Sequence, residues 1–375
     1  MITLKGMTWS HPRGFDPMVA TAAEWQRKTG VAIEWDKRSL QDFESFPVEE
    51  LARQYDFIVI DHPHVGQITK EQCLVPLDVA GREAERAEMA AHSVGKSYPS
   101  YTWEGHQWAF PIDAASQVQA YRADLIAAPL SRWDEVVALA RAGRVVLPMR
   151  PPHSMMSFYT LAANIGSPCA VTGPGELIAE ADGVSVIELL RAVTDHIDPA
   201  QFEMDPIQAS ELMAQTDSPY AVMPLGYGYL SYALDGFRPK RLKFVDIPVA
   251  GNNGPVGSAI GGTGIAVSAF SRHRAEAIDY AYWVAGADIQ KTLYAQSGGQ
   301  PGHGLAWEDE AVNAPVDGFY RDTRATLEGG WLRPRHDGYM AFQDAASRRL
   351  NAGLLAREDG AAIVRAINDL YRESF

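Results

Sequence analysis

Imidazole and carboxylate groups stand close together in the segment Asp61-His-Pro-His64, directly after an apolar stretch. Such groups are good ligands for transition metals, so a metal site is one interpretation. A His-Pro-His sequence is a weak metal signal, however, and no third ligand on a helix accompanies it. We favour a loop in which Asp61, His62 and His64 hydrogen-bond to a bound molecule, with a purely structural loop as the alternative.

Two more polar loops follow short apolar segments. The first, Trp9-Ser-His-Pro-Arg13, offers an indole face, the His11 imidazole and the Arg13 guanidinium. Aromatic faces bind the apolar faces of sugar rings, so Trp9 is a candidate ligand contact. The second, Asp36-Lys-Arg-Ser39, contributes Ser39 as a hydrogen-bonding group. The alternatives are an ordinary turn for the first loop and a solvated charged surface for the second.

The segment Met149-Arg-Pro-Pro-His-Ser154 precedes a predicted helix. Backbone N–H groups at a helix start favour anions, and Arg150 adds positive charge beside His153. This segment therefore points to a carboxylate or phosphate rather than a neutral sugar. An ordinary strand-to-helix loop is the alternative.

The glycine-rich segment Gly261-Gly-Thr-Gly264 lacks the G-x-G-x-x-G spacing of a dinucleotide site. Close approach of the backbone to a ligand explains these glycines more simply, so Gly262 and Thr263 are candidate contacts. No G-x-S-x-G, H-E-x-x-H or Walker A pattern occurs in the chain. The sequence therefore predicts no catalytic residue, no metal and no cofactor.

Composition sets outer limits on the function. A chain of 375 residues fits about two domains, and 46% hydrophobic with 21% charged residues is typical of a globular protein. A net charge of -14 argues against nucleic acid or anionic membrane as a partner. Cys73 and Cys169 form either one disulfide or two buried free thiols. The sequence shows no run of about 18 apolar residues and begins without a signal peptide, so either the signal was removed or the native protein is cytoplasmic.

The first 60 residues alternate between strand and helix patterns. Strands are expected at 2–7, 31–35 and 56–60, and helices at 17–29 and 48–55. This order predicts a parallel sheet with helices on both faces. Ligands of such sheets bind beyond the carboxyl ends of the strands, which is where the loops at Trp9, Ser39 and Asp61 begin.

Further along the chain, strands and helices continue to alternate. Helices are expected at 133–142, 184–194 and 207–215, a helical hairpin at 153–165, and strands at 117–121, 145–148 and 220–225, after which 242–249 leads back towards the first part of the fold. After the glycine-rich segment, a strand at 265–267 leads to a helix that Ser271 caps, and a second short helix at 289–296 ends in Ser-Gly-Gly.

Four segments together resemble the family 1 extracellular solute-binding proteins, the capture subunits of ABC importers. The segment 257–303 matches in its strand, helix pair and glycine placement. The other three are Cys73-Leu-Val-Pro-Leu-Asp78, the Trp- and Gly-containing stretch 101–113, and Trp331-Leu-Arg-Pro334. The resemblance covers nearly the whole chain.

The resemblance implies an α/β fold with two lobes, the type II periplasmic-binding-protein fold. Each lobe would hold a mainly parallel sheet flanked by helices, and crossing strands near Pro111 and Pro255 would form the hinge. Lobe one is expected to comprise 1–112 and 256–308, and lobe two 113–255 and 309–375. The ligand would lie in the interlobe cleft, where Asp113 beside the crossing and Tyr227 and Tyr229 in an aromatic loop add further contacts.

The function implied by the resemblance is capture of a small polar solute, a carbohydrate or polyol, for delivery to an ABC permease. The protein would be a monomer in the periplasm or outside the cell, with no covalent step and no insertion into the membrane. Two alternatives remain open. One is a small carboxylate as the ligand, and the other is a cytosolic sensor or enzyme built on the same fold.

Overall fold

A computed structural model describes residues 2–40, 42 and 47–375. Contacts divide the chain into two compact units. Unit 1 comprises Met1–Ala115, Gly261–Ala314 and Arg335–Asp337, and unit 2 comprises Ser116–Ile260, Pro315–Pro334 and Gly338–Phe375. The sequence predicts two lobes that move as rigid bodies, formed by 1–112 with 256–308 and by 113–255 with 309–375. These lobe boundaries stay a prediction.

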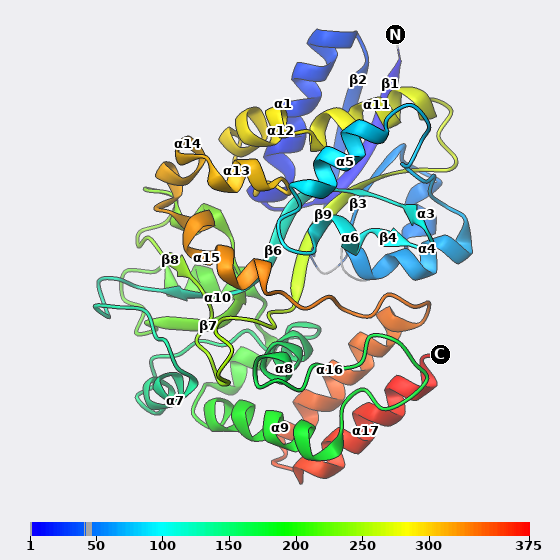
Figure 1. Ribbon diagram of the computed structural model, residues 1–375. Coiled ribbons are helices and arrows are strands. Elements are labelled where there is room, and N and C mark those ends of the chain that lie inside the picture. The colour runs from blue at the N-terminus through cyan, green and yellow to red at the C-terminus, as the bar shows by residue number, and fades with distance from the viewer. Residues whose placement is uncertain (1, 41, 43–46) are drawn as a thin grey trace. The chain divides into compact units, whose positions relative to one another are not determined.

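The sheet of unit 1 contains β1 (Thr3–Trp9), β2 (Ala32–Arg38), β3 (Phe57–Ile60) and β9 (Ile260–Val267). β1 lies in the middle and pairs parallel with both β2 and β3, whereas β9 pairs antiparallel with β3 (Figure 1). The helix α1 (Pro12–Thr29) connects β1 to β2, and α3 (Val48–Ala52) precedes β3. The predicted alternation of strand and helix in this part of the chain is confirmed.

Local sequence sets both ends of α1. The Nδ1 atom of His11 accepts a hydrogen bond from the N–H of Arg13 at 3.1 Å, and Pro12 occupies the first turn. Proline is well suited to that position because its missing N–H would have no partner there. At the other end Gly30 adopts φ 79°, a left-handed conformation that closes the helix. The helix thus begins five residues earlier than the predicted 17–29.

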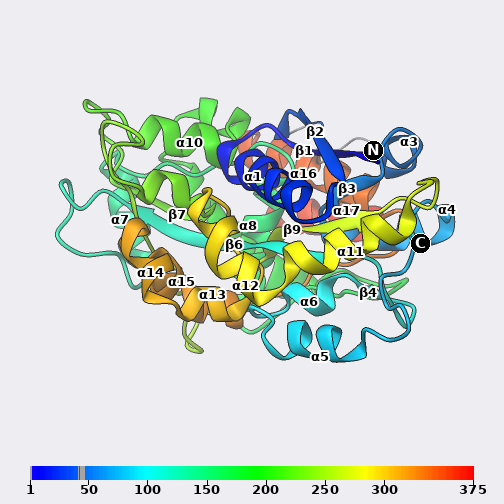
Figure 2. The same cartoon turned by 90° about the horizontal axis from the view of Figure 1, so that it is seen from above.

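Aromatic side chains fill the core of unit 1. Trp35 on β2 stacks on Phe57 on β3, with ring centroids 5.8 Å apart. Tyr280 of α11 (Arg274–Ala285) contacts both Phe57 and Trp25 of α1, which fixes α1 and α11 near each other (Figure 2). The hydrophobic effect of burying these large rings gives unit 1 a core of its own.

The remaining elements of unit 1 are short. They are η1 (His62–His64), α4 (Val65–Glu71), α5 (Glu83–Ala91), α6 (Ser97–Ser100), β4 (Thr102–Trp103), β5 (His106–Gln107), α12 (Ala287–Ile289), the π-helix η4 (Gln290–Tyr294), α13 (Gly304–Glu308) and α14 (Glu310–Asn313). The helix predicted at 289–296 therefore contains a π-helical turn.

The strands of unit 2 differ from the prediction. β6 (Phe110–Tyr121) pairs antiparallel with both β7 (Val222–Tyr227) and β8 (Lys243–Val245), so a mainly parallel second sheet is wrong for these strands. Within the described part of the chain, the segment predicted as a strand at 145–148 forms no named strand and makes one isolated parallel bridge, from Val145 to Val222. Pro148 explains part of this, because proline has no N–H to donate to a ladder.

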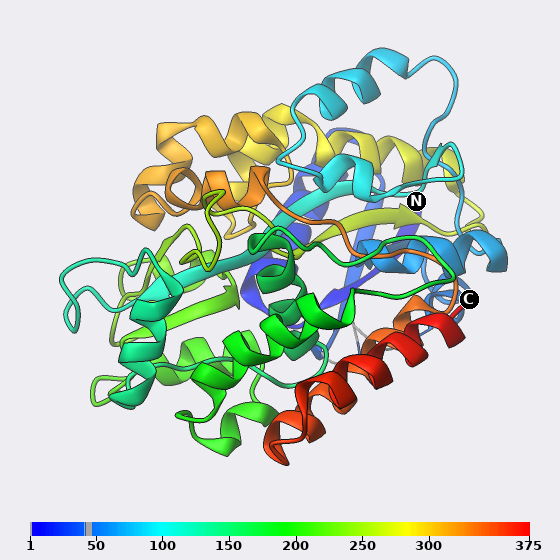
Figure 3. The ribbon, with the colours of Figure 1, turned by 60° about the horizontal axis from the view of Figure 1, so that its bottom comes forward.

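Helices make up most of unit 2. The C-terminal helix α17 (Gly360–Glu373) packs between α9 (Glu180–Thr194) and α16 (Tyr339–Leu355), and α8 (His153–Asn164) packs on α9 and α16 (Figure 3). The other helices are α7 (Trp133–Arg141), η2 (Pro199–Glu203), α10 (Pro206–Met213), η3 (Leu230–Ala233), η5 (Ala314–Val316) and α15 (Phe319–Glu328). Among the described residues, no helix has the length and apolar character needed to cross a membrane.

Strand β6 belongs to both units. Its first half lies beside β9, and its second half pairs with β7 and β8. The hydrogen-bonded path of strands is therefore continuous from β2 to β7, rather than being two separate sheets. The boundary between the units falls after Ala115 in β6 and after Ile260 in β9.

Three residues near the C-terminus return to unit 1. The Nη1 atom of Arg335 donates to the carbonyl oxygens of Pro99, Ser100 and Thr102 at 2.9–3.0 Å. The carbonyl oxygen of Arg335 lies so close to Gly66 that a Cβ atom there would be 1.8 Å away. The segment Arg335–Asp337 is thus held by unit 1, whereas the residues on both sides of it belong to unit 2.

Both cysteines are free and buried. Burial raises the pKa of Cys73 to about 12, and that of Cys169 also lies well above its usual value because of burial. A thiol reacts through its thiolate, so we expect neither to react with Ellman's reagent in the native protein at pH 8. Both should react once urea unfolds the chain. Rapid labelling of either thiol before unfolding would contradict this expectation.

Candidate ligand-binding site

The carboxyl edge of the unit 1 sheet gathers most of the predicted contacts from this half of the chain. Trp9 at the end of β1 pairs with Arg38 at the end of β2, and Ile60 at the end of β3 pairs with Gly264 of β9. Met7 pairs with Ile58, so the same register brings Trp9 level with Ile60. The loops that follow β1, β2 and β3 therefore begin at the same level, at one edge of the sheet. The predicted contacts at or just beyond these strand ends are Trp9, His11, Arg13, Ser39, Asp61, His62 and His64, while Gly262 and Thr263 lie on β9 next to Gly264.

The indole of Trp9 is part of the hydrophobic core of unit 1 and is only 3% exposed. It packs on the first turn of α1, where a Cβ atom at Gly14 would come within 2.3 Å of the ring. Trp9 therefore has a clear packing role. His11 is also engaged locally, as the cap of α1. A ligand contact for either residue stays a prediction.

Arg13 and Asp113 lie 100 residues apart in the sequence but form a buried ion pair. The Nε atom of Arg13 donates to Oδ2 of Asp113 at 2.7 Å, and Nη2 donates to Oδ1. Burial raises the pKa of Asp113, and the guanidinium opposes this rise. We predicted each residue as a separate ligand contact, whereas the structure joins their charges. A solute here would meet a paired carboxylate rather than an isolated one.

The loop after β3 forms the short 3-10 helix η1, which Asp61 caps. The Asp61 carboxylate accepts from the N–H of His62 at 2.9 Å. The His62 side chain is fully buried, with its ring 6.4 Å from that of Tyr101. The described residues include no group of three or more His, Cys, Asp or Glu side chains placed to hold a metal ion.

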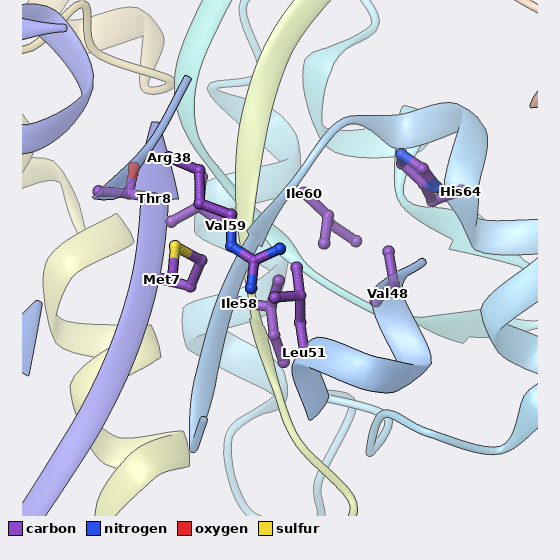
Figure 4. Close-up of a pocket in the computed structure, with 9 residues that line it drawn as sticks. All are labelled: Met7, Thr8, Arg38, Val48, Leu51, Ile58, Val59, Ile60 and His64. Carbon is purple, nitrogen blue, oxygen red and sulfur yellow. The ribbon is translucent and has the colours of Figure 1, made fainter. Parts of the chain in front are cut away.

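A small pocket opens at this edge of the sheet (Figure 4). It is lined by Met7, Thr8, Arg38, Val48, Leu51, Ile58, Val59, Ile60 and His64. The space open to a water-sized sphere is about 10 Å³, which is room for roughly one water and not for a sugar. Arg38 and Thr8 were not predicted as site residues. Arg38 pairs with Trp9 and Thr8 directly precedes Trp9 in β1, so their positions at the strand ends are the signal that could have drawn attention to them.

Gly262 and Thr263 lie on β9, where it runs beside β6. Gly262 has φ +88°, and a Cβ atom there would be 2.4 Å from the carbonyl oxygen of Asp113. The close approach of the two backbones is enough to require glycine at position 262, and a ligand contact there stays a prediction. Thr263 is 5% exposed, and its hydroxyl has no hydrogen-bond partner within the described part of the chain.

Ser39 is exposed and makes a local turn. Its hydroxyl donates to a carboxylate oxygen of Asp42 at 2.8 Å, and the N–H of Asp42 donates back to it. Ser39 therefore differs from predicted contacts such as His11 and Arg13, whose side chains are buried. A ligand contact for Ser39 stays a prediction.

In unit 2, Arg150 is paired with Asp205 at 2.7 Å. His153 is buried, and its ring lies 6.1 Å from that of Tyr227. Burial, followed by the positive charges of Arg150 and Arg333, lowers the pKa of His153 to about 3. The imidazole is thus neutral at pH 7, so His153 can offer a hydrogen bond but no charge.

The aromatic loop of unit 2 is mostly buried. Tyr229 is 5% exposed and precedes the 3-10 helix η3. Tyr227 is half-buried and pairs in the sheet with Gln117. The structure thus brings His153 and Tyr227 together, and a ligand contact for Tyr229 stays a prediction.

The comparisons with known proteins agree with this architecture. A family model described as bacterial extracellular solute-binding protein matches residues 20–304. No curated protein sequence matches the chain significantly.

Solved structures resemble the chain over its whole length at low identity. One is an ABC transporter solute-binding protein from Agrobacterium radiobacter K84 in complex with ribitol, with TM-score 0.81, 20% identity, and 100% of this chain and 99% of that chain covered. Another is the maltose-bound MalE3 of T. maritima, with TM-score 0.84, 14% identity and full coverage of both chains. A third, from Thermotoga lettingae TMO, holds alpha-D-tagatose and has the same TM-score, identity and coverage. These similarities show the two-lobed fold of such binding proteins.

Proposed function

We propose, because the chain belongs to the bacterial extracellular solute-binding protein family, that it captures a small polyhydroxylated solute of the carbohydrate or polyol class. It would deliver this solute to the membrane permease of an ABC importer, acting as a monomer in the periplasm or outside the cell. The observation that carries the proposal is the family match over residues 20–304. The neighbours that hold ribitol, maltose and tagatose support the class of solute.

The polar groups of the described residues suit hydroxyl recognition. His153 is neutral, and the carboxylate of Asp113 is paired with Arg13. Hydroxyl groups need donors and acceptors that are already held in place, because each unpaired polar group in a closed site costs about 1–3 kcal/mol. Binding proteins of this family perform no reaction, and we propose that this chain likewise returns its solute unchanged.

A thermal-shift screen over aldoses, ketoses, alditols and sugar acids tests the proposal, followed by isothermal titration of the best solute. We expect a rise in melting temperature with one class and a stoichiometry of one solute per chain. Binding stabilises the folded state by RT ln(1 + [L]/Kd), about 2.7 kcal/mol at a hundredfold excess over Kd. Mass spectrometry after incubation should recover the solute intact. A screen in which no such compound raises the melting temperature, or in which the solute is converted, would contradict the proposal.

A further inference from the structure

The first turn of α8 is an unusual helix start. Its N-cap residue is Pro152, which makes no side-chain cap hydrogen bond, and the turn contains no acidic residue. The positive end of the helix dipole is therefore not offset by a side chain of the helix itself. α8 is 12 residues long, enough for the dipole to matter at its end.

Ser154, in this first turn, has polar groups that the described structure leaves without partners. The N–H groups of His153, Met155 and Met156 donate to the carbonyls of Arg150 and Pro152. The N–H of Ser154 has no such acceptor among the described residues, and neither does its hydroxyl. Ser154 is nonetheless fully buried. Since an unpaired buried polar group is costly, two of them on one residue call for an explanation.

The orientation of helix side chains places these two groups together. Side chains in an α-helix lean toward its N-terminus, so the hydroxyl of Ser154 lies beside the first-turn N–H groups. Ser157, one turn later, accepts a hydrogen bond from Gln117 of β6. Ser154 is three residues before Ser157, so the two serines share the face of α8 that contacts β6.

The charges around the helix start favour an anion. Arg150 lies three residues before His153, the first residue of the helix. Burial, and then the positive charges of Arg150 and Arg333, lower the pKa of His153. Asp205 offsets part of the charge of Arg150. The helix dipole adds to the positive field at this place, and a neutral His153 does not compete for an anion.

We propose that the N-terminus of α8, with the N–H and hydroxyl of Ser154, is an oxyanion subsite and that the solute is a sugar acid. This inference rests on the proposed function, since it specifies which polyhydroxylated solute the protein captures. The carboxylate of an aldonate or uronate would accept hydrogen bonds from both groups of Ser154. Such bonds to a charged acceptor are stronger than bonds to a neutral hydroxyl, which gives selectivity over the matching sugar alcohol.

Isothermal titration with matched pairs of probes tests the subsite. Ribonate is compared with ribitol, and gluconate with glucitol, because each pair differs only in a carboxylate against a hydroxymethyl group. We expect the wild-type protein to bind at least one acid tenfold or more tightly than its alditol. Ser154→Ala should weaken that acid about tenfold and change the alditol less than twofold. Ser185→Ala, on the exposed surface of α9, is the control and should change neither.

The stability of the variant separates a binding role from a structural one. The Ser154 hydroxyl has no partner among the described residues, so Ser154→Ala should leave the urea midpoint unchanged or slightly raised. A large loss of stability would overturn the inference, and so would an alditol that binds as tightly as its acid. The second result would leave the proposed function intact. If no sugar, alditol or sugar acid binds at all, both proposals fail. If Ser154→Ala does not fold, the affinities of the wild-type protein for each sugar acid and its alditol decide whether the inference holds.

Discussion

Replacing Asp113 with alanine is expected to lower the free energy of unfolding by about 3–5 kcal/mol. The Arg13 side chain is 4% exposed and the Asp113 side chain is fully buried. Removing the carboxylate leaves the guanidinium without its bidentate counterion in a site that water does not reach, which is the costly way to break a buried ion pair. Urea denaturation followed by circular dichroism measures the change.

Two further variants test whether the loss of stability in Asp113→Ala comes from the burial of the ion pair. The double variant R13M/D113L replaces both charges with apolar groups, so we expect it to lose less stability than Asp113→Ala alone. Asp337→Ala removes the partner of Lys70 in an ion pair whose side chains are 77% and 42% exposed, and it should cost less than about 1 kcal/mol. Equal losses for Asp113→Ala and Asp337→Ala would show that burial of the Arg13 pair has no energetic weight.

Substituting Gly262 with alanine is expected to lower the free energy of unfolding by about 2–5 kcal/mol. The residue has φ +88°, which costs an L-residue roughly 1–2 kcal/mol. The added methyl group would also lie 2.4 Å from the carbonyl oxygen of Asp113, so β6 and β9 would have to separate. Overpacking of this kind adds about 1–3 kcal/mol.

Gly298 is the matched control for the backbone contribution. It has φ +85°, but a Cβ atom there would meet no atom within 4 Å. Gly298→Ala should therefore cost only the conformational part, about 1–2 kcal/mol. The difference between the two variants measures the contact of β9 with β6. If both alanines cost the same, the close approach of these strands is not a constraint on stability.

Most of the architecture could be predicted from local patterns. The strands around Leu4, Ile33 and Ile58 are apolar runs bounded by polar residues, and α1 ends at Gly30 as its sequence indicates. The pairing direction of β6 with β7 could not be predicted in the same way. Alternation and length identify a strand, whereas the direction of its neighbour depends on contacts between distant segments, such as Val118 with Gly226.

The sequence directed attention to the loops at the carboxyl ends of the parallel strands, and Arg38 lies level with Trp9 at that edge of the sheet. That a ligand binds there stays a prediction. Roles depended on partners that sequence does not reveal. Arg13 with Asp113, and Arg150 with Asp205, are pairs separated by 100 and 55 residues. Ser154 was overlooked because a serine in a first helical turn is unremarkable until its burial and its lack of partners are known.

The position of β9 between β3 and β6 has a consequence during synthesis of the chain. Phe57–Ile60 leaves the ribosome early, but its partner Ala266 and the rest of β9 emerge about 200 residues later. Until then one side of β3 presents unpaired N–H and C=O groups on a fully apolar strand, which is a template for pairing with another chain. We therefore expect the nascent chain to be prone to aggregation until β9 has been synthesised. Pairing of β9 with β3 both completes the sheet of unit 1 and covers the exposed backbone groups of β3.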